Sequence, residues 1–202
     1  MASRSTVTTH TGPTSLIPSD ASPGLLFLKA WLTAIDTLDP TTHPIEPLLA
    51  KHASLLMGNE PPSHAKHIGP MLQVRAQHLE AFGHELLIAW DIELCGKRES
   101  IEGETTETRT GTGTDERKEH REKRGRRTVM FEALSSTVFK NDPDKFETKV
   151  KEFNVIELEE SSHRDGRLLA TEIRTYMDSR PVQDRAARLH AQSSYGESRS
   201  QY

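Results

Sequence analysis

The chain has 202 residues, of which 34% are hydrophobic and 28% charged, and its formal net charge is −4. This length fits one domain with some polar extensions, and the composition is too polar for a membrane protein. The negative charge offers no general attraction for nucleic acid. The single cysteine, Cys95, excludes an internal disulfide.

Residues 1–23 are rich in Ser, Thr and Pro with few large apolar side chains, which predicts a disordered N-terminal arm. From Gly24 the pattern changes, because apolar residues recur at helical spacing (Leu25, Leu28, Leu32, Ile35) with Trp31 beside them. This pattern predicts an amphipathic helix that ends near Asp39 and Pro40.

Two short elements and a longer helix are predicted next. Residues 45–51 favour a short helix that follows Pro44, and "SLLMG" at 54–58 favours a brief strand before the turn "NEPPS". Residues 65–82 favour a longer helix, with Pro70 in its first turns.

Beyond Gly83 the hydrophobic period becomes two, which is typical of strands. In "HELLIAWDIELC" the alternation puts Leu86, Ile88 and Trp90 on one face and Asp91 on the other. Three further strands are predicted in "RTVMFEALSSTVF", "TKVKEFNVIELEE" and "RLLATEIRTYMDS", the last two joined by a hairpin at Asp165-Gly166. Four successive strands after the helices predict an α+β fold with a strongly curved antiparallel sheet.

Residues 97–127 separate the first two long strands and have no apolar face, so we expect a charged, mobile insertion. Its basic part, 117–127, fits either a nuclear-import or anion-binding segment or, as we favour, a solvated loop. Residues 191–202 are predicted to be a disordered tail. With no signal peptide and no apolar run of the roughly 20 residues that span a bilayer, we expect a cytoplasmic protein, with a nuclear location as the alternative.

The order of these elements resembles the NTF2-like, SnoaL-like family over residues 25–189. The resemblance is carried by "FLKAWLTAIDTLD", "IEPLLAKHASLLM", "HIGPMLQVRAQHLEAF" and "IRTYMDSRPVQ", and is greatest to small fungal proteins, several of them from pathways to polyketides and terpenoids. It implies one domain at 24–190 in which a bent sheet wraps around helices and leaves an apolar pocket. Family members include cyclases, isomerases, epoxide hydrolases, dehydratases and proteins that only bind, so the fold does not give the function.

The predicted last strand carries Glu172, Arg174, Tyr176 and Asp178 on one face. The usual alternation would place this polar face outward. The resemblance instead implies an Asp near the strand's end that points into the pocket, which makes Asp178 the candidate base. Arg174 would keep Asp178 ionised and contact substrate, and Tyr176 would either donate to a ligand carbonyl or brace Asp178. The alternatives are that Asp178 pairs with Arg174 at the surface or caps the following helix.

Two histidines, His78 and His84, are candidate catalytic partners, although a single histidine is more often packed or half-exposed than catalytic. Large apolar residues would form the pocket wall or simply the core: Trp31, Met57, Trp90 and Phe131. His64 and His67 lack a convincing third ligand, so no metal site is predicted.

These residues leave two functions open. The first is a cofactor-independent isomerase, cyclase or dehydratase that transfers a proton on a small apolar metabolite. The second is a non-catalytic homodimer or ligand-binding protein, paired through the apolar sheet residues Leu134, Val138 and Val155. A third hypothesis, with less support in the sequence, is a transport-factor adaptor that uses the basic loop. An apolar cavity with at least two converging titratable groups would favour the enzyme.

Overall fold

The structure is a computed structural model that describes residues 5–58, 60–94, 126–161 and 166–197, with side chains as far as 192. Its helices are α1 (Pro23–Asp36), α2 (Ile68–His78) and α4 (Arg180–Glu197). Its strands are β1 (Ser5–Thr11), β2 (Leu49–Met57), β3 (Ser63–His64), β4 (Leu79–Leu94), β5 (Arg126–Phe139), β6 (Thr148–Glu160) and β7 (Leu168–Met177). Three short 3₁₀ helices are η1 (Thr14–Leu16), η2 (Glu46–Leu48) and η3 (Ala65–His67).

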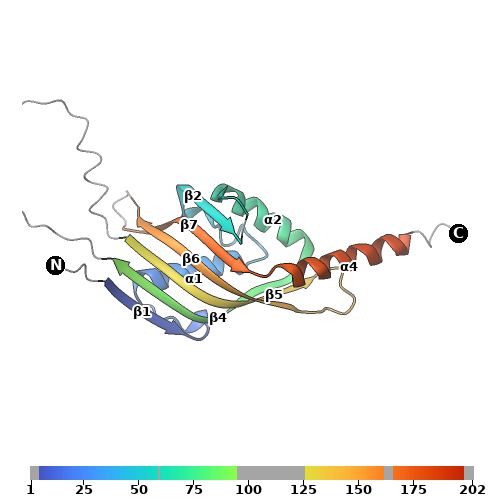
Figure 1. The fold of residues 1–202 in the computed structure, drawn as a ribbon, viewed down its shortest axis with the longest axis horizontal. Coiled ribbons are helices and arrows are strands. Elements are labelled where there is room, and N and C mark those ends of the chain that lie inside the picture. Colours follow the sequence, from blue (N-terminus) through green and yellow to red (C-terminus); the bar gives the residue numbers. More distant parts are fainter. Residues whose placement is uncertain (1–4, 59, 95–125, 162–165, 198–202) are drawn as a thin grey trace, which may run out of the picture.

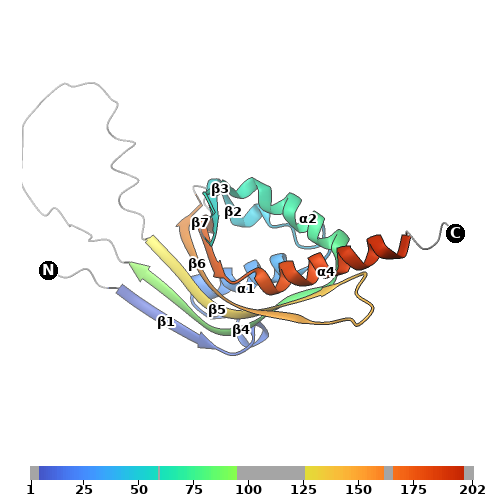
Figure 2. The ribbon, with the colours of Figure 1, turned by 45° about the vertical axis from the view of Figure 1, so that its right-hand side comes forward.

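All seven strands form one sheet in the order β1-β4-β5-β6-β7-β2-β3. The sheet bends around α1 and α2, which lie on its concave side, while α4 leaves the end of β7 and extends beyond the body of the protein (Figures 1 and 2). The predicted α+β class with a strongly curved sheet is therefore confirmed. The four long strands pair antiparallel as predicted, and the sheet is mixed only where β2 pairs with β7 in parallel.

The core lies between α1 and the concave face of the sheet. α1 buries one side along its whole length, with Leu25, Leu28 and Leu32 at most 3% exposed, against sheet residues such as Phe131 and Ile156. The helix is amphipathic as predicted, but it ends at Asp36, because Thr37 turns to an extended conformation.

The N-terminal arm is not disordered from residue 5 onward. Ser5–Thr11 forms β1, which pairs with β4 from Ser5 opposite Leu94 to Thr11 opposite Ile88. The Ser/Thr-rich composition suggested disorder, but threonine and valine are also strong strand formers when a neighbouring edge is present.

Four other boundaries differ from prediction. The expected helix at 45–51 is only the short η2, followed directly by β2, and the helix at 65–82 stops at His78. The expected tail is helical as far as Glu197 in α4. The charged insertion at 97–127 lies outside the described residues except for Arg126 and Arg127, which begin β5.

A bulge in β4 changes which residues face the core. Leu86 pairs with Ala133 and Ile88 pairs with Glu132, so Leu87 is an extra residue and the alternation shifts by one. Asp91 therefore points inward and is 1% exposed, while Trp90 lies on the outer face. The predicted faces of this strand were wrong beyond the bulge, because strict period-two counting cannot see an inserted residue.

The buried Asp91 fixes the start of α1 to the sheet. Its Oδ2 accepts the backbone N–H of Gly24 at 2.9 Å and a guanidinium N–H of Arg127 at 2.6 Å. The Gly24 N–H lies in the first turn of α1, where a nearby carboxylate is favourable to the helix dipole. This contact also explains the glycine, because a Cβ at residue 24 would lie 2.4 Å from the Asp91 carboxylate.

Gly24→Ala is expected to lower the free energy of unfolding by about 1–3 kcal/mol, the usual cost of overpacking. The matched control is Gly83→Ala, where no atom lies within 4 Å of the added Cβ. The free energy of unfolding of that variant should be unchanged or slightly higher than that of the wild type. Urea denaturation of both variants tests the pair, and equal stabilities would contradict the proposed Asp91 contact.

Candidate active site

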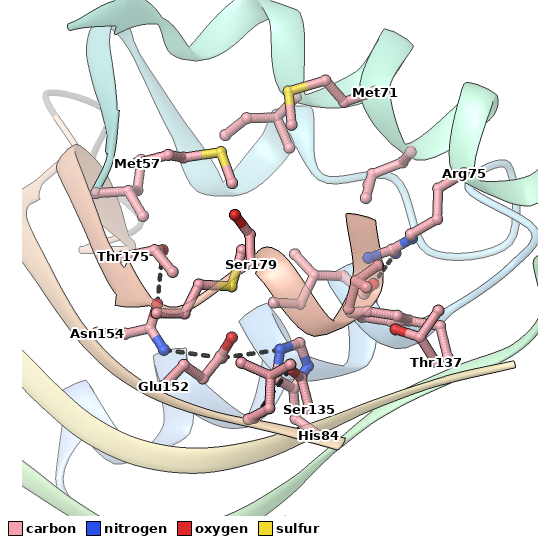
Figure 3. Close-up of a pocket in the computed structure, with 18 of the residues that line it drawn as sticks. Met57, Met71, Arg75, His84, Ser135, Thr137, Glu152, Asn154, Thr175 and Ser179 are labelled. Carbon is pink, nitrogen blue, oxygen red and sulfur yellow. Dashed lines mark hydrogen bonds and ion pairs between the residues drawn. The ribbon is translucent and has the colours of Figure 1, made fainter. Parts of the chain in front are cut away.

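A cavity of about 250 Å³ lies between the concave face of the sheet, α1, α2 and the first turn of α4 (Figure 3). This volume is near the lower end of ligand pockets, which typically span roughly 300–1,000 Å³. Most of its wall is apolar: Trp31, Ile35, Leu55, Met57, Ile68, Met71, Leu72, Phe82, Val150, Ile173, Met177 and Val182. The polar lining residues are Arg75, His84, Ser135, Thr137, Glu152, Asn154, Thr175, Ser179 and Gln183.

His84 is held between two carboxylates. Its Nδ1 is bonded to Oδ1 of Asp36, at the end of α1, and its Nε2 lies 2.9 Å from Oε1 of Glu152 on β6. The backbone N–H of His84 also donates to Asp36, at 3.2 Å. Since carboxylates only accept, both ring nitrogens donate and the ring is an imidazolium.

This arrangement raises the pKa of His84. Burial favours the neutral ring and by itself would lower the pKa, because the side chain is only 4% exposed. The hydrogen bonds to Asp36 and Glu152, together with their negative charges, outweigh burial and raise the pKa from 6.5 to about 9. His84 is therefore a cation at neutral pH, and it cannot act as a base there.

Glu152 is the buried carboxylate that faces the cavity. Its Oε1 accepts both the His84 ring and, at 2.9 Å, the side-chain amide of Asn154. Asn154 is in turn fixed by the hydroxyl of Thr175, which donates to its Oδ1 at 2.7 Å. Both fixed contacts use Oε1, so Oε2 is left for a ligand. The chain of dashed contacts from Thr175 to His84 runs along the floor of the pocket in Figure 3.

Arg75 enters the cavity from α2. Its Nη2 donates to the backbone carbonyl of Ile35 and lies 3.5 Å from that of Thr37, so it binds the C-terminal end of α1. Its guanidinium stacks on Phe82, with 3.9 Å from Cζ to the ring centroid. Burial lowers its pKa from the ordinary guanidinium value to about 10, so it stays charged at neutral pH.

The three groups Asp36, His84 and Glu152 do not surround a common point, because the carboxylates bind opposite nitrogens of one ring. In the part of the chain that the structure describes, no cluster of His, Cys, Asp and Glu has the grouping of a metal site. The arrangement is suited to proton transfer, with an oriented carboxylate in an apolar wall.

The first turn of α4 closes one side of the cavity through Ser179, Val182 and Gln183. Residues 180–192 include no fully buried side chain, so the helix packs only weakly on the body. Its main attachment is Arg185, which donates to both oxygens of the buried Asp142 in the β5–β6 turn, with Nε at 2.8 Å. The Arg185 hydrogen bonds are the main reason that the pKa of Asp142 is lowered.

Arg185→Gln is expected to increase local opening of α4, because it removes the hydrogen bonds to Asp142 that attach the helix to the sheet. Hydrogen exchange of the amides at 182–189 should be at least severalfold faster, while exchange in β6 stays unchanged. Arg188→Gln, at an exposed position of the same helix, is the matched control. Equal exchange in the two variants would mean that the Arg185–Asp142 pair does not hold the helix.

Comparison with known proteins supports the fold but not a specific activity. No family model matches the sequence, and no curated protein sequence matches it either. Among solved structures, a conserved protein from Planctomyces limnophilus aligns with a TM-score of 0.51 at 8% identity, over 77% of this chain and 94% of the other. PrhC from Penicillium brasilianum aligns with a TM-score of 0.50 at 11% identity, over 84% of this chain and 89% of PrhC. A candidate scytalone dehydratase from Novosphingobium aromaticivorans aligns with a TM-score of 0.50 at 6% identity, over 77% of this chain and 82% of the other.

This chain has an NTF2-like fold. The cavity described above lies inside the bent sheet. No helix of the described residues is long and apolar enough to cross a membrane.

Three of the residues selected from the sequence line the NTF2-like cavity: His84, Trp31 and Met57. Their roles in catalysis and substrate binding stay predictions. His78 does not reach the cavity, because it is exposed at the end of α2. Phe131 is 1% exposed and packs in the core without lining the cavity.

The predicted orientation of the last strand was wrong. The residues of β7 that line the cavity are Ile173, Thr175 and Met177, which alternate with the candidates. Asp178 points to solvent, with its side chain 51% exposed, and pairs with Arg180. The hydrogen bonds from Arg180 lower the pKa of Asp178, and its Oδ1 also accepts the Arg180 backbone N–H at the start of α4. The alternative of a helix-end contact is therefore correct, and an inward-pointing base is not.

The other candidates that were expected to face the pocket lie on the outer face for the same reason. Arg174 is paired with Glu172, and Tyr176 is 48% exposed and stacks on Phe153. Trp90 is outside because of the β4 bulge. The usual rule that the polar face of a strand meets water correctly describes β7.

Sequence reasoning missed Glu152, Asp36 and Arg75. A signal for Glu152 was present, because Glu152 and Asn154 interrupt the face of β6 that also carries Val150, Ile156 and Leu158. Polar residues inside an apolar face require partners, which marks a candidate site. Asp36 and Arg75 gave no such signal, since both are ordinary residues on a helix.

Proposed function

We propose that this protein is a cofactor-independent enzyme that transfers a proton on a small, mostly apolar molecule, in an isomerisation, cyclisation or dehydration, with Glu152 as the base. The observation that supports this proposal is the arrangement of contacts around the two oxygens of the Glu152 carboxylate. One oxygen is held by His84 and Asn154, and the other is left for a ligand in an apolar cavity. The resemblance to fungal proteins of polyketide and terpenoid pathways supports substrates of those classes.

Each member of the site then has a physical task. The imidazolium of His84 fixes the carboxylate and offsets its charge, which matters because the Glu152 side chain is only 6% exposed. Asp36 fixes the ring from the other side and balances its charge. The apolar wall excludes water from the carboxylate, so that a bound ligand meets Glu152 without competing solvent.

The enzyme is favoured over a purely structural role by the polarity of the cavity. A wholly apolar or filled cavity would fit a structural protein, whereas here Arg75, His84 and Glu152 converge on an open one. Pairing of two copies through the outer face of the sheet stays a prediction. Analytical ultracentrifugation of Leu134→Glu against the wild type would test it, with a monomeric variant as the expected result.

Deuterium exchange tests the proposed reaction class directly. Purified protein is incubated in D₂O with a panel of small cyclic ketones and enones, and deuterium at the carbon next to the carbonyl is followed by NMR. We expect protein-dependent exchange for those ketones that fit the cavity. Exchange at the buffer rate for the whole panel would argue against a proton-transfer enzyme of this kind.

A further inference from the structure

We infer that Arg75 binds a carbonyl oxygen of the substrate and stabilises the negative charge that forms there, so that the substrate class is a neutral, mainly hydrocarbon ketone or enone. This inference rests on the proposed role of Glu152 as the base. It adds to that role the identity of the oxygen-binding group and the functional group of the substrate.

The charges around the cavity are balanced before a substrate enters. Three lining residues carry a full charge, Arg75, His84 and Glu152, and Asp36 adds a negative charge behind His84. Two positive and two negative charges leave no net attraction for an anion or a cation. A neutral ligand with a polar end therefore fits this cavity better than a carboxylate or an amine.

Removal of a proton from carbon disturbs this balance. As Glu152 becomes neutral, the negative charge moves to the substrate, and a cation near the new charge lowers the barrier. His84 is poorly placed to receive this charge, because both of its ring nitrogens already donate to carboxylates. The other cation that lines the cavity is Arg75, which is therefore the candidate to receive the charge.

The contacts of Arg75 leave it able to bind an oxygen. Within the described part of the chain it takes part in no ion pair, and both of its hydrogen bonds use Nη2 toward neutral backbone carbonyls. Among the described residues its Nη1 has no acceptor and is the donor available to a ligand, while its Nε is buried, also without an acceptor. A charged guanidinium with unused donors is strongly stabilised by an acceptor oxygen.

Arg75 also lies at a suitable place relative to the base. Phe82 is packed between the two cations, with the Arg75 guanidinium 3.9 Å from its ring centroid and the His84 ring centroid 5.1 Å away in an edge contact. Figure 3 shows Arg75 at one end of the hollow and Glu152 beside His84 on its floor. A single small molecule can therefore span from Arg75 to Glu152.

The chemical step balances without any other reactant. Oε2 of Glu152 takes the proton from the carbon next to the carbonyl, and the electrons of that C–H bond form a carbon–carbon double bond. The carbonyl π electrons move to the oxygen, which becomes an enolate oxygen at Arg75. When the ketone is unsaturated at the β,γ position the enolate is a dienolate, and return of the proton from Glu152 to its γ carbon completes an isomerisation. With a saturated ketone the proton returns to the carbon that it left.

A matched pair of ligands tests the oxygen site without requiring turnover. Para-ethylphenol imitates a flat enolate with its oxygen, and para-ethyltoluene has a methyl group in place of the hydroxyl. In titration calorimetry we expect the wild type to bind the phenol at least about tenfold more tightly, as for a hydrogen bond to a charged donor. Arg75→Met should remove this preference while it leaves the affinity for the toluene unchanged.

Two further variants separate this inference from the proposed function. Glu152→Gln should keep the preference for the phenol, since Arg75 is intact. Arg75→Lys retains the cation, should keep part of the preference, and serves if the Met variant does not fold. A preference lost in Glu152→Gln but kept in Arg75→Met would overturn the inference and leave the base in place. No binding of either ligand to the wild type would overturn both proposals.

Discussion

Glu152→Gln is expected to slow deuterium exchange into a bound ketone by at least about a hundredfold, the lower range for a positioned base. The amide retains the shape of the side chain but has no lone pair basic enough to accept a proton from carbon. The variant should stay folded, because its oxygen can still accept from the ring of His84 and from Asn154, as Oε1 does in the wild type. NMR exchange rates per mole of folded protein provide the measurement.

Asp178→Asn is the matched control for this experiment. It makes the same carboxylate-to-amide change at the acid that the sequence favoured, and the structure places that acid at the surface with Arg180. Its exchange rate should lie within about twofold of the wild type, as expected for an exposed side chain. If Asp178→Asn lost activity and Glu152→Gln kept it, the assignment of the base would be reversed.

His84→Gln should be the most destabilising single change in the site. It leaves Glu152 buried and Asp36 partly buried without the positive charge between them. Removal of one partner from a buried ionic group typically costs about 3–5 kcal/mol. We expect the free energy of unfolding to fall by about 3 kcal/mol at neutral pH, as measured by urea denaturation followed by circular dichroism. His78→Gln, at an exposed position of α2, should unfold like the wild type.

The same contact gives the wild type a characteristic pH dependence. The pKa of His84 is about 9 in the folded protein against 6.5 without the fold, so the folded state binds the proton more tightly. The stabilisation is fully present below pH 6.5, falls as the pH rises, and is lost above about 9. A shift of this size corresponds to about 3 kcal/mol for a buried side chain.

Comparison of the two proteins across this pH range isolates the effect of the histidine. The wild type should lose stability between pH 6.5 and 9, whereas His84→Gln should lack this decline, so that the two curves approach each other at high pH. A constant difference between the curves would show that the ring does not carry a proton in the folded state. His78→Gln should follow the wild-type curve throughout.

The periodic parts of the fold were predictable from the chain alone. The helical spacing of Leu25, Leu28 and Leu32 gives α1, and the alternation in β5, β6 and β7 gives three of the four long strands of the sheet. These patterns depend only on which side chains avoid water, so they can be read without neighbours. Boundaries were less certain, as at residues 65–82, where helix gives way to strand at Leu79 without a change in composition.

The direction of side chains required the tertiary structure. The single extra residue Leu87 reverses the directions in which the side chains of Trp90 and Asp91 point. Nothing in the local sequence indicates this bulge. The likeness to a known family placed Asp178 inward, but a one-residue change of register moves a side chain to the opposite face of a strand. The disordered arm was mispredicted for a related reason, since β1 is stable only because β4 offers it an edge.

What the sequence determined by itself is the class of fold and the apolar residues that build it, because hydrophobic periodicity acts locally along each helix and strand. The site depends on the folded chain, because Asp36, His84 and Glu152 come from three elements that are far apart in the sequence. Their pairing depends on the bend of the sheet over the end of α1, and the altered pKa of His84 exists only where these charges meet out of water.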